Sequence, residues 1–151
     1  MKVGPTLDGR LRIDAEDDDD WFLLGCIAKD AAGDSLAERY GEMMDGEVAE
    51  DWREYVVPDL AEQFEGKVMG VQRAIDEARE GGSGQIWVTR ETAFDWYGAL
   101  NLARLALEER YRFGPGRVLK RANQDPERYF AYIRSGFYSA IQSMLLGNLM
   151  K

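Results

Sequence analysis

The most apolar segment of the chain is residues 93–107, which read AFDWYGALNLARLAL. Its strongly polar members are Asp95, Asn101 and Arg104, so a helix over this segment is apolar on nearly every side. A helix of that kind is usually the buried centre of a bundle, because a surface helix needs one polar face. The segment therefore predicts a long central helix over about residues 89–112, with other helices packed around it.

The segments around this helix carry helix signals of their own. Four acidic residues at 17–20 precede an apolar block, and carboxylates at a helix start accept bonds from the free amide groups there. Residues 58–80 show an apolar stripe at spacings of three and four, and the helix at 125–148 begins with the capping sequence DPE. Shorter helices are expected over 35–44 and 47–56.

The final helix has an apolar stripe that predicts which of its sides is buried. Apolar side chains spaced by three or four residues lie on one face of a helix. We expect the inner face to consist of Tyr129, Ile133, Phe137, Ala140, Met144 and Leu145.

Two short stretches have the pattern of β-strands. Residues 11–15 alternate apolar and polar side chains, and residues 85–88 read QIWV. Pairing the two would attach the N-terminal arm, residues 1–16, to the helical body. The overall expectation is a single, mainly α domain over residues 1–151. It is an orthogonal bundle of about five helices around a buried central helix, with a minor two-stranded β element.

Composition argues against several classes of function. The chain has no histidine and one cysteine, so imidazole catalysis, zinc sites and internal disulfides are not expected. No serine lies in a nucleophile elbow, and the acidic run at 17–20 lacks the spacing of a calcium loop. We therefore expect a non-enzymatic protein with no catalytic residues, no cofactor and no metal. No signal-peptide core or long apolar run is present, so a cytoplasmic protein without a membrane span is expected.

The 28 acidic and 19 basic residues are unevenly distributed. Residues 1–66 hold 19 acidic and 6 basic residues, whereas residues 67–151 hold 9 and 13. The net charge of −9 argues against nucleic acid binding, which needs a surplus of cations. The most basic stretch contains no acid and includes Arg110, Arg112, Arg117, Lys120 and Arg121. It is a docking patch for an acidic partner or anionic ligand, a solvated loop after a helix end, or a surface that faces the acidic half of this chain or of a second copy.

Asn101 and Arg104 lie three residues apart on one side of the central helix. A lone buried charge costs several kcal/mol, so Arg104 must be paired or reach solvent. Its candidate partners are Asp95, Glu108, or Gln142 and Asn148 of the final helix. The arrangement is either an internal polar clamp that fixes the helix register or the polar floor of a groove that binds a carboxylate or a peptide backbone.

Residues 100–107, which read LNLARLAL, resemble the signature of an uncharacterised bacterial family catalogued as domain of unknown function 2017. Leu60 with Lys67 is similar to the family's preceding helix. The final helix resembles the family's C-terminal helix, which carries a glutamine at the place of Gln142.

The resemblance covers about residues 50–150 and implies no established activity or site residues. Genes of the family often neighbour a gene for an adaptor of the Clp protease, which implies a link to regulated proteolysis by association.

These observations lead to two hypotheses for the function, a leading one and an alternative. The first is a protein interaction or adaptor domain that engages another cytosolic protein, such as a proteolysis component, through exposed aromatics and the basic segment 110–121. A homodimer is a further expected assembly. The alternative is a sensor for a small anionic ligand with an arginine-lined pocket. The candidate binding residues are Asn101, Arg104, Gln142, Arg110, Arg112, Arg117, Lys120 and Arg121.

Overall fold

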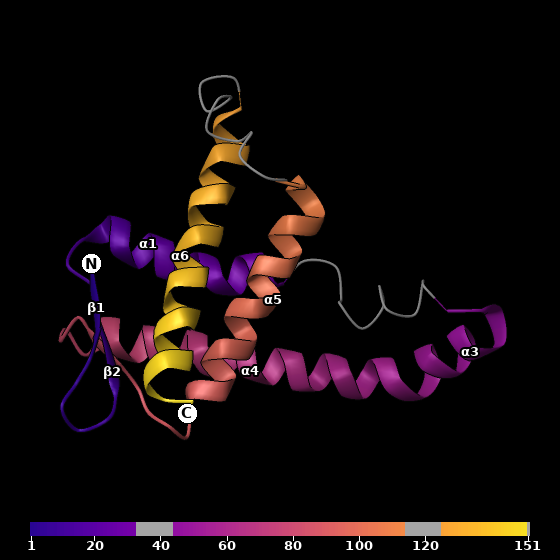
Figure 1. Cartoon of the computed structure of the whole chain (residues 1–151), viewed down its shortest axis with the longest axis horizontal. Coiled ribbons are helices and arrows are strands. Elements are labelled where there is room, and N and C mark those ends of the chain that lie inside the picture. Colours follow the sequence, from indigo (N-terminus) through magenta and orange to yellow (C-terminus); the bar gives the residue numbers. More distant parts are fainter. Residues whose placement is uncertain (33–43, 114–124, 151) are drawn as a thin grey trace.

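The computed structural model describes residues 1–32, 44–113 and 125–150, and this part of the chain is mainly helical (Figure 1). The expected helix over 35–44 lies outside the described residues, apart from Met44. The described elements are, in order, β1 (Lys2–Pro5), β2 (Leu11–Asp14), α1 (Asp18–Ala31), α3 (Gly46–Asp51), the π-helical turn η1 (Trp52–Val56), α4 (Val57–Glu80), β3 (Gln85–Val88), α5 (Ala93–Tyr111) and α6 (Pro126–Asn148).

The central helix of the fold is α5, which packs against α6, α1 and α4. The prediction of a central helix is confirmed, but its burial is one-sided, because Phe94 is 65% and Leu105 38% exposed. The helix begins later than expected, since Thr89 and Thr92 bond to each other in a turn before it. The buried residues of α5 lie on one face of the helix: Ala93, Trp96, Ala99, Leu100, Ala103 and Leu107.

The three strands form one antiparallel sheet in the order β1-β2-β3. The two strands expected from the sequence, β2 and β3, pair with each other, with Leu11 opposite Val88 and Ile13 opposite Ile86. These four side chains are buried and join the helical core. The third strand, β1, was not predicted, because its sequence KVGP contains glycine and proline and shows no regular alternation.

The acidic run before α1 is a helix start, as predicted. Asp17 precedes the first turn, and its carboxylate accepts a hydrogen bond from the Asp20 amide at 2.9 Å. Among the described residues, no group of acidic or sulfur side chains is placed to hold a metal ion.

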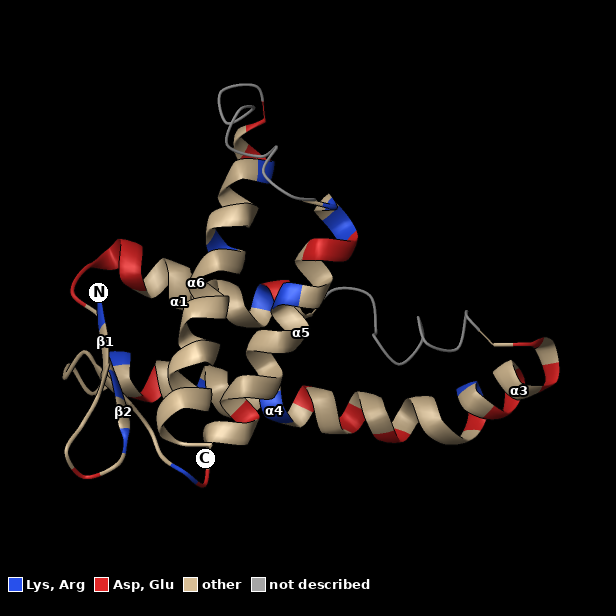
Figure 2. Ribbon diagram, viewed as in Figure 1, with Lys and Arg blue, Asp and Glu red and all other residues tan. Residues whose placement is uncertain are grey.

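The two helices expected over 47–56 and 58–80 form one continuous helical run. The turn η1 joins α3 to α4, and within it the amide of Val57 donates to the Trp52 carbonyl five residues earlier. Pro58 lacks an amide hydrogen, so it fits the first turn of α4 directly after this wide turn instead of breaking the chain's helical path. Figure 1 shows α3 and the start of α4 extending away from the other helices, and Figure 2 shows acidic residues along them.

The expected inner face of α6 is confirmed only in part. Leu145 is buried, and Tyr129, Phe137 and Met144 are partly buried against the core. Ile133, which is 43% exposed, and Ala140 lie outside the core. Apolar residues lie on two sides of this helix, and spacing alone cannot tell which side packs. Two residues with polar ends, Tyr138 and Gln142, point inward because they find hydrogen-bond partners there. The buried residues of α6 are Ala131, Tyr138, Ile141, Gln142 and Leu145.

Candidate functional site

Arg104 and Gln142 form a polar clamp between α5 and α6. The Arg104 Nη1 atom donates to Gln142 Oε1 at 2.5 Å, and Gln142 Nε2 donates to the Tyr97 carbonyl at 3.3 Å. Gln142 is 2% exposed, so these bonds satisfy a buried amide. Of the partners expected for Arg104, the structure therefore selects Gln142.

The clamp leaves part of the predicted polar group unpaired. Arg104 Nε is buried and has no hydrogen-bond partner. Within the described chain, Arg104 forms no ion pair with Asp95 or Glu108, and the Asn148 amide instead donates to the Met144 carbonyl at 2.8 Å. Asn101 is half-buried.

The two described members of the basic segment lie where α5 ends beside the start of α6. Arg112 ends α5 in the left-handed conformation with φ of 46°, and its carbonyl accepts from Arg128 Nη2 at 2.7 Å. Arg110 lies 3.9 Å from the Glu127 carboxylate, and both side chains are exposed. The other three candidates lie outside the described residues: Arg117, Lys120 and Arg121.

An aromatic cluster holds this end of the two helices together. The rings of Tyr111 and Phe113 are stacked at 6.0 Å, and Phe113 meets Tyr132 of α6 edge-on at 5.6 Å. The Tyr111 hydroxyl donates to Glu127 at 2.9 Å. Burial and this hydrogen bond raise the pKa of Tyr111. The cluster therefore holds the C-terminal end of α5 beside the start of α6.

A second polar cluster, which the sequence analysis did not identify, joins α1 to α6. Arg134 donates to both carboxylate oxygens of Asp30 at 2.8 and 3.0 Å, and the Tyr138 hydroxyl donates to Asp30 at 2.6 Å. Burial, with the hydrogen bond to Asp30, raises the pKa of Tyr138 above its usual value. One signal could have revealed this cluster, since Arg134 is the single charged residue in the sequence from 129 to 150.

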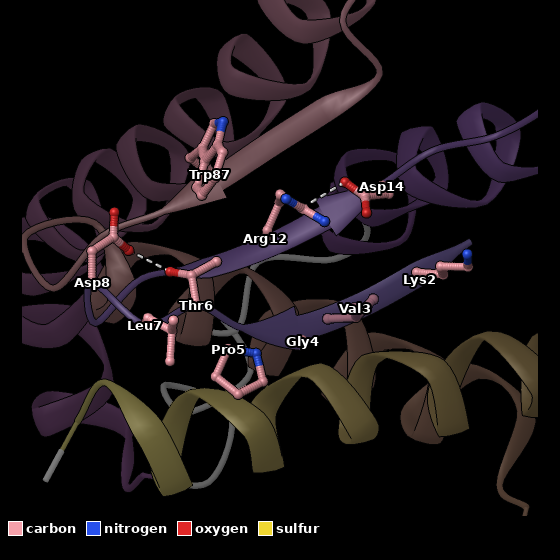
Figure 3. Close-up of a pocket in the computed structure, with 10 residues that line it drawn as sticks. All are labelled: Lys2, Val3, Gly4, Pro5, Thr6, Leu7, Asp8, Arg12, Asp14 and Trp87. Atoms are coloured by element: carbon pink, nitrogen blue, oxygen red, sulfur yellow. Dashed lines mark hydrogen bonds and ion pairs between the residues drawn. The ribbon is translucent and has the colours of Figure 1, made fainter.

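A depression of about 620 Å³ lies on the outer face of the sheet, and Figure 3 shows Trp87, Arg12 and Asp14 around it. Arg12 Nε lies 3.0 Å from Asp14 Oδ1, and the Arg10 guanidinium lies 4.0 Å from the centre of the Trp87 ring.

Carboxylates already neutralise the arginines at this depression. Arg10 Nε donates to Asp8 at 2.9 Å, and this bond lowers the pKa of Asp8 to about 2. Arg12 is the arginine that lines this depression, and Arg104 is not among its lining residues.

One side of α6 presents a row of apolar side chains that runs beside its buried face. We call this row the α6 outer stripe; it consists of Phe130, Ile133, Phe137, Ala140 and Met144. Phe130, Ile133 and Ala140 are exposed, whereas Phe137 and Met144 are partly buried and pack against the core. Phe130 is 48% and Ile133 43% exposed, and the Arg134 guanidinium lies 5.8 Å from the Phe130 ring centre.

These features define a mainly helical domain whose helices are joined by polar side-chain clamps and whose last helix carries exposed apolar side chains such as Phe130 and Ile133. The family model for domain of unknown function DUF2017 matches residues 16–149, so the chain belongs to that family. No curated protein and no solved structure matches the chain. In the part of the chain that the structure describes, no helix is both long and apolar enough to cross a membrane.

Proposed function

We propose that this domain is a non-enzymatic protein interaction module and that the α6 outer stripe is its docking surface. The observation that supports the proposal is the exposure of large apolar side chains on α6, next to the face of this helix that is buried in the core. Phe130 and Ile133 are each more than two-fifths exposed, whereas Tyr138 and Leu145 are fully buried. Exposed apolar surface of this kind marks an interaction site more often than it serves a monomer.

The spacing of the stripe favours a helical partner. Its members are separated by three, four, three and four residues. That repeat is the one by which two helices pack side by side, with each apolar side chain inserted between residues of the other helix. Aromatic residues such as Phe130 and Phe137 are also the side chains that supply much of the binding energy at interfaces.

Charge around the stripe favours an acidic partner. The sequence from 129 to 150 contains no acidic residue. Lys29 of α1 lies 5.6 Å from the ring of Phe22, which is itself 55% exposed, so a cation and an aromatic ring share a surface on the adjacent helix. Arg112 adds positive charge near the N-terminal end of α6, where Arg110 lies 3.9 Å from the Glu127 carboxylate. The proposed occupant is therefore an amphipathic helix with an apolar side and acidic flanks.

The kind of protein that carries this helix is the second part of the proposal. We infer a cytosolic component of regulated proteolysis, because genes of the family often neighbour one for an adaptor of the Clp protease. That adaptor is the first partner to test.

A matched pair of substitutions on α6 tests the surface. Ile133→Glu places a charge in the stripe, and Leu146→Glu places one at a residue that is 49% exposed on another side of the helix. Loss of one buried isoleucine side chain costs about 1.5–3 kcal/mol, so Ile133→Glu is expected to weaken binding of the purified Clp adaptor at least about tenfold. Leu146→Glu is expected to change the affinity less than about twofold. Isothermal titration calorimetry gives both values.

The possible results test the docking surface and the identity of the partner separately. Equal losses in the two variants would show that the stripe is not the docking surface. If the adaptor does not bind the unmodified chain, the partner assignment is wrong. A photo-crosslinker at position 133, compared with one at 146, then reports whether the stripe contacts a different acidic helical protein.

A further inference from the structure

We propose that the solvent-facing side of α5 binds a small oxyanion, a carboxylate or a phosphate, between Lys67 of α4 and Arg104. Asn101 lies between these two cations along the helix. The site is separate from the α6 outer stripe and does not depend on the proposed function.

The position of Lys67 depends on a glycine of α5. A Cβ atom built on Gly98 would lie 2.9 Å from Lys67 Cδ and 3.2 Å from Lys67 Nζ. The glycine therefore leaves the space in which the lysine side chain lies across α5, and any side chain at residue 98 would displace it. The ammonium group is thus held on the surface of α5 instead of extending into solvent.

Helix geometry places Asn101 next to both cations. Residues three apart on an α-helix are surface neighbours, with Cβ atoms about 5–6 Å apart. Gly98, Asn101 and Arg104 are successive neighbours of this kind, so residues 98 and 104 are separated by about 9 Å along the axis and about 120° around it. Lys67 thus marks one end of a short polar row, Asn101 its middle, and Arg104 its other end, where Gln142 holds the guanidinium against α6.

The row carries two positive charges without a carboxylate. In the described part of the chain, neither Lys67 nor Arg104 forms an ion pair, although acidic residues outnumber basic ones by 28 to 19. Arg134, by contrast, meets Asp30 at 2.8 Å. The acidic residues of α5 nearest the row, Asp95 and Glu108, are exposed and form no ion pair with it.

The chemistry of the row selects an oxyanion. A guanidinium presents several donors in one plane and suits carboxylate or phosphate oxygens, and an ammonium group supplies a point charge. Arg104 uses the terminal nitrogen Nη1 on Gln142, and its Nε is buried, so Nη2 is the donor that remains for an anion; it forms no hydrogen bond with the described residues. Because Asn101 also has no hydrogen-bond partner among the described residues, its amide can donate to the same anion.

Nuclear magnetic resonance of the full chain tests the site. Inorganic phosphate and acetate are titrated separately at constant ionic strength, and the Asn101 side-chain amide and the Arg104 Nη–H resonance are followed. We expect saturable shifts of both resonances with at least one anion. Lys67→Gln is expected to weaken that binding about tenfold, since a charged hydrogen bond is lost. The exposed cation Arg73 on the same helix provides the control, and Arg73→Gln is expected to change the affinity less than about twofold.

The choice of variants keeps the fold intact, because Arg104 itself is not altered. Saturation by phosphate alone, or by acetate alone, supports the site and identifies the oxyanion. Shifts that do not saturate, that sodium chloride reproduces, or that Lys67→Gln leaves unchanged would overturn the proposal.

Discussion

Two isoleucines of α6 separate its inner face from its outer stripe, since Ile141 is 1% exposed and Ile133 is 43% exposed. Ile141→Ala removes buried atoms and leaves a cavity, a change that costs about 2–5 kcal/mol of unfolding free energy. Ile133→Ala forfeits roughly half the transfer free energy of one side chain, about 1 kcal/mol, and leaves no cavity. The higher helix propensity of alanine returns a few tenths of a kcal/mol in both variants. We therefore expect the two losses to differ by about 2 kcal/mol.

Urea unfolding followed by circular dichroism measures this difference. With a denaturant dependence of about 2 kcal/mol per molar urea, the Ile141→Ala midpoint should fall about 1 M further than that of Ile133→Ala. The series is run at two protein concentrations, because a homodimer that buried Ile133 would make its loss concentration-dependent. Equal losses at low concentration would refute the assignment of the two faces.

Two further predictions concern a buried hydroxyl and a constrained turn. The pKa of Tyr138 is raised in the folded chain, so its contribution to stability is complete below pH 10 and is lost as the pH rises further. Above pH 10 the unfolding free energy of the unmodified chain should fall by about 1.4 kcal/mol per pH unit because of Tyr138, and Tyr138→Phe should remove this fall. Urea unfolding at several pH values measures it, and an unchanged fall in the variant would contradict the buried bond to Asp30. At Gly84, where φ is +68°, a Cβ would lie 2.8 Å from the Ala15 carbonyl oxygen, whereas nothing lies within 4 Å at Gly9, where φ is +84°. Gly84→Ala should cost more than the approximately 1–2 kcal/mol expected of Gly9→Ala, and equal thermal shifts would show that the Ala15 contact imposes no constraint.

Much of the fold could be predicted because single segments carry strong local signals. The acidic run before α1, the apolar stripe of α4 and the capping sequence of α6 each define a helix without reference to the remainder of the chain. Local side-chain patterns also indicated the strands β2 and β3, but their pairing, which joins residues far apart in the sequence, was left open by those patterns. The strand β1 was missed because its stability depends on β2 and on packing, which a short glycine- and proline-containing segment does not reveal.

The candidate site, like the fold, could be predicted from the sequence only in part. Arg104 could be identified as a residue in need of a partner, because a charge in an apolar helix has few alternatives. Which face of α6 is buried could not be inferred, since Tyr138 and Gln142 turn inward only because Asp30 and Arg104 lie opposite them. Whether side chains such as Tyr138 and Gln142 are buried depends on hydrogen-bond partners on other elements, and the sequence of α6 alone does not specify those partners.

The wide turn η1 also sets the direction in which α3 points its side chains. A bond that spans five residues instead of four contains one extra residue. Deleting one residue from this turn would restore the ordinary ladder, but it would rotate all of α3 by about 100° around the axis relative to α4. The length of this turn therefore sets the rotation of α3 about the helix axis. Chains that differ by one residue in η1 would turn a different side of α3 toward their surroundings.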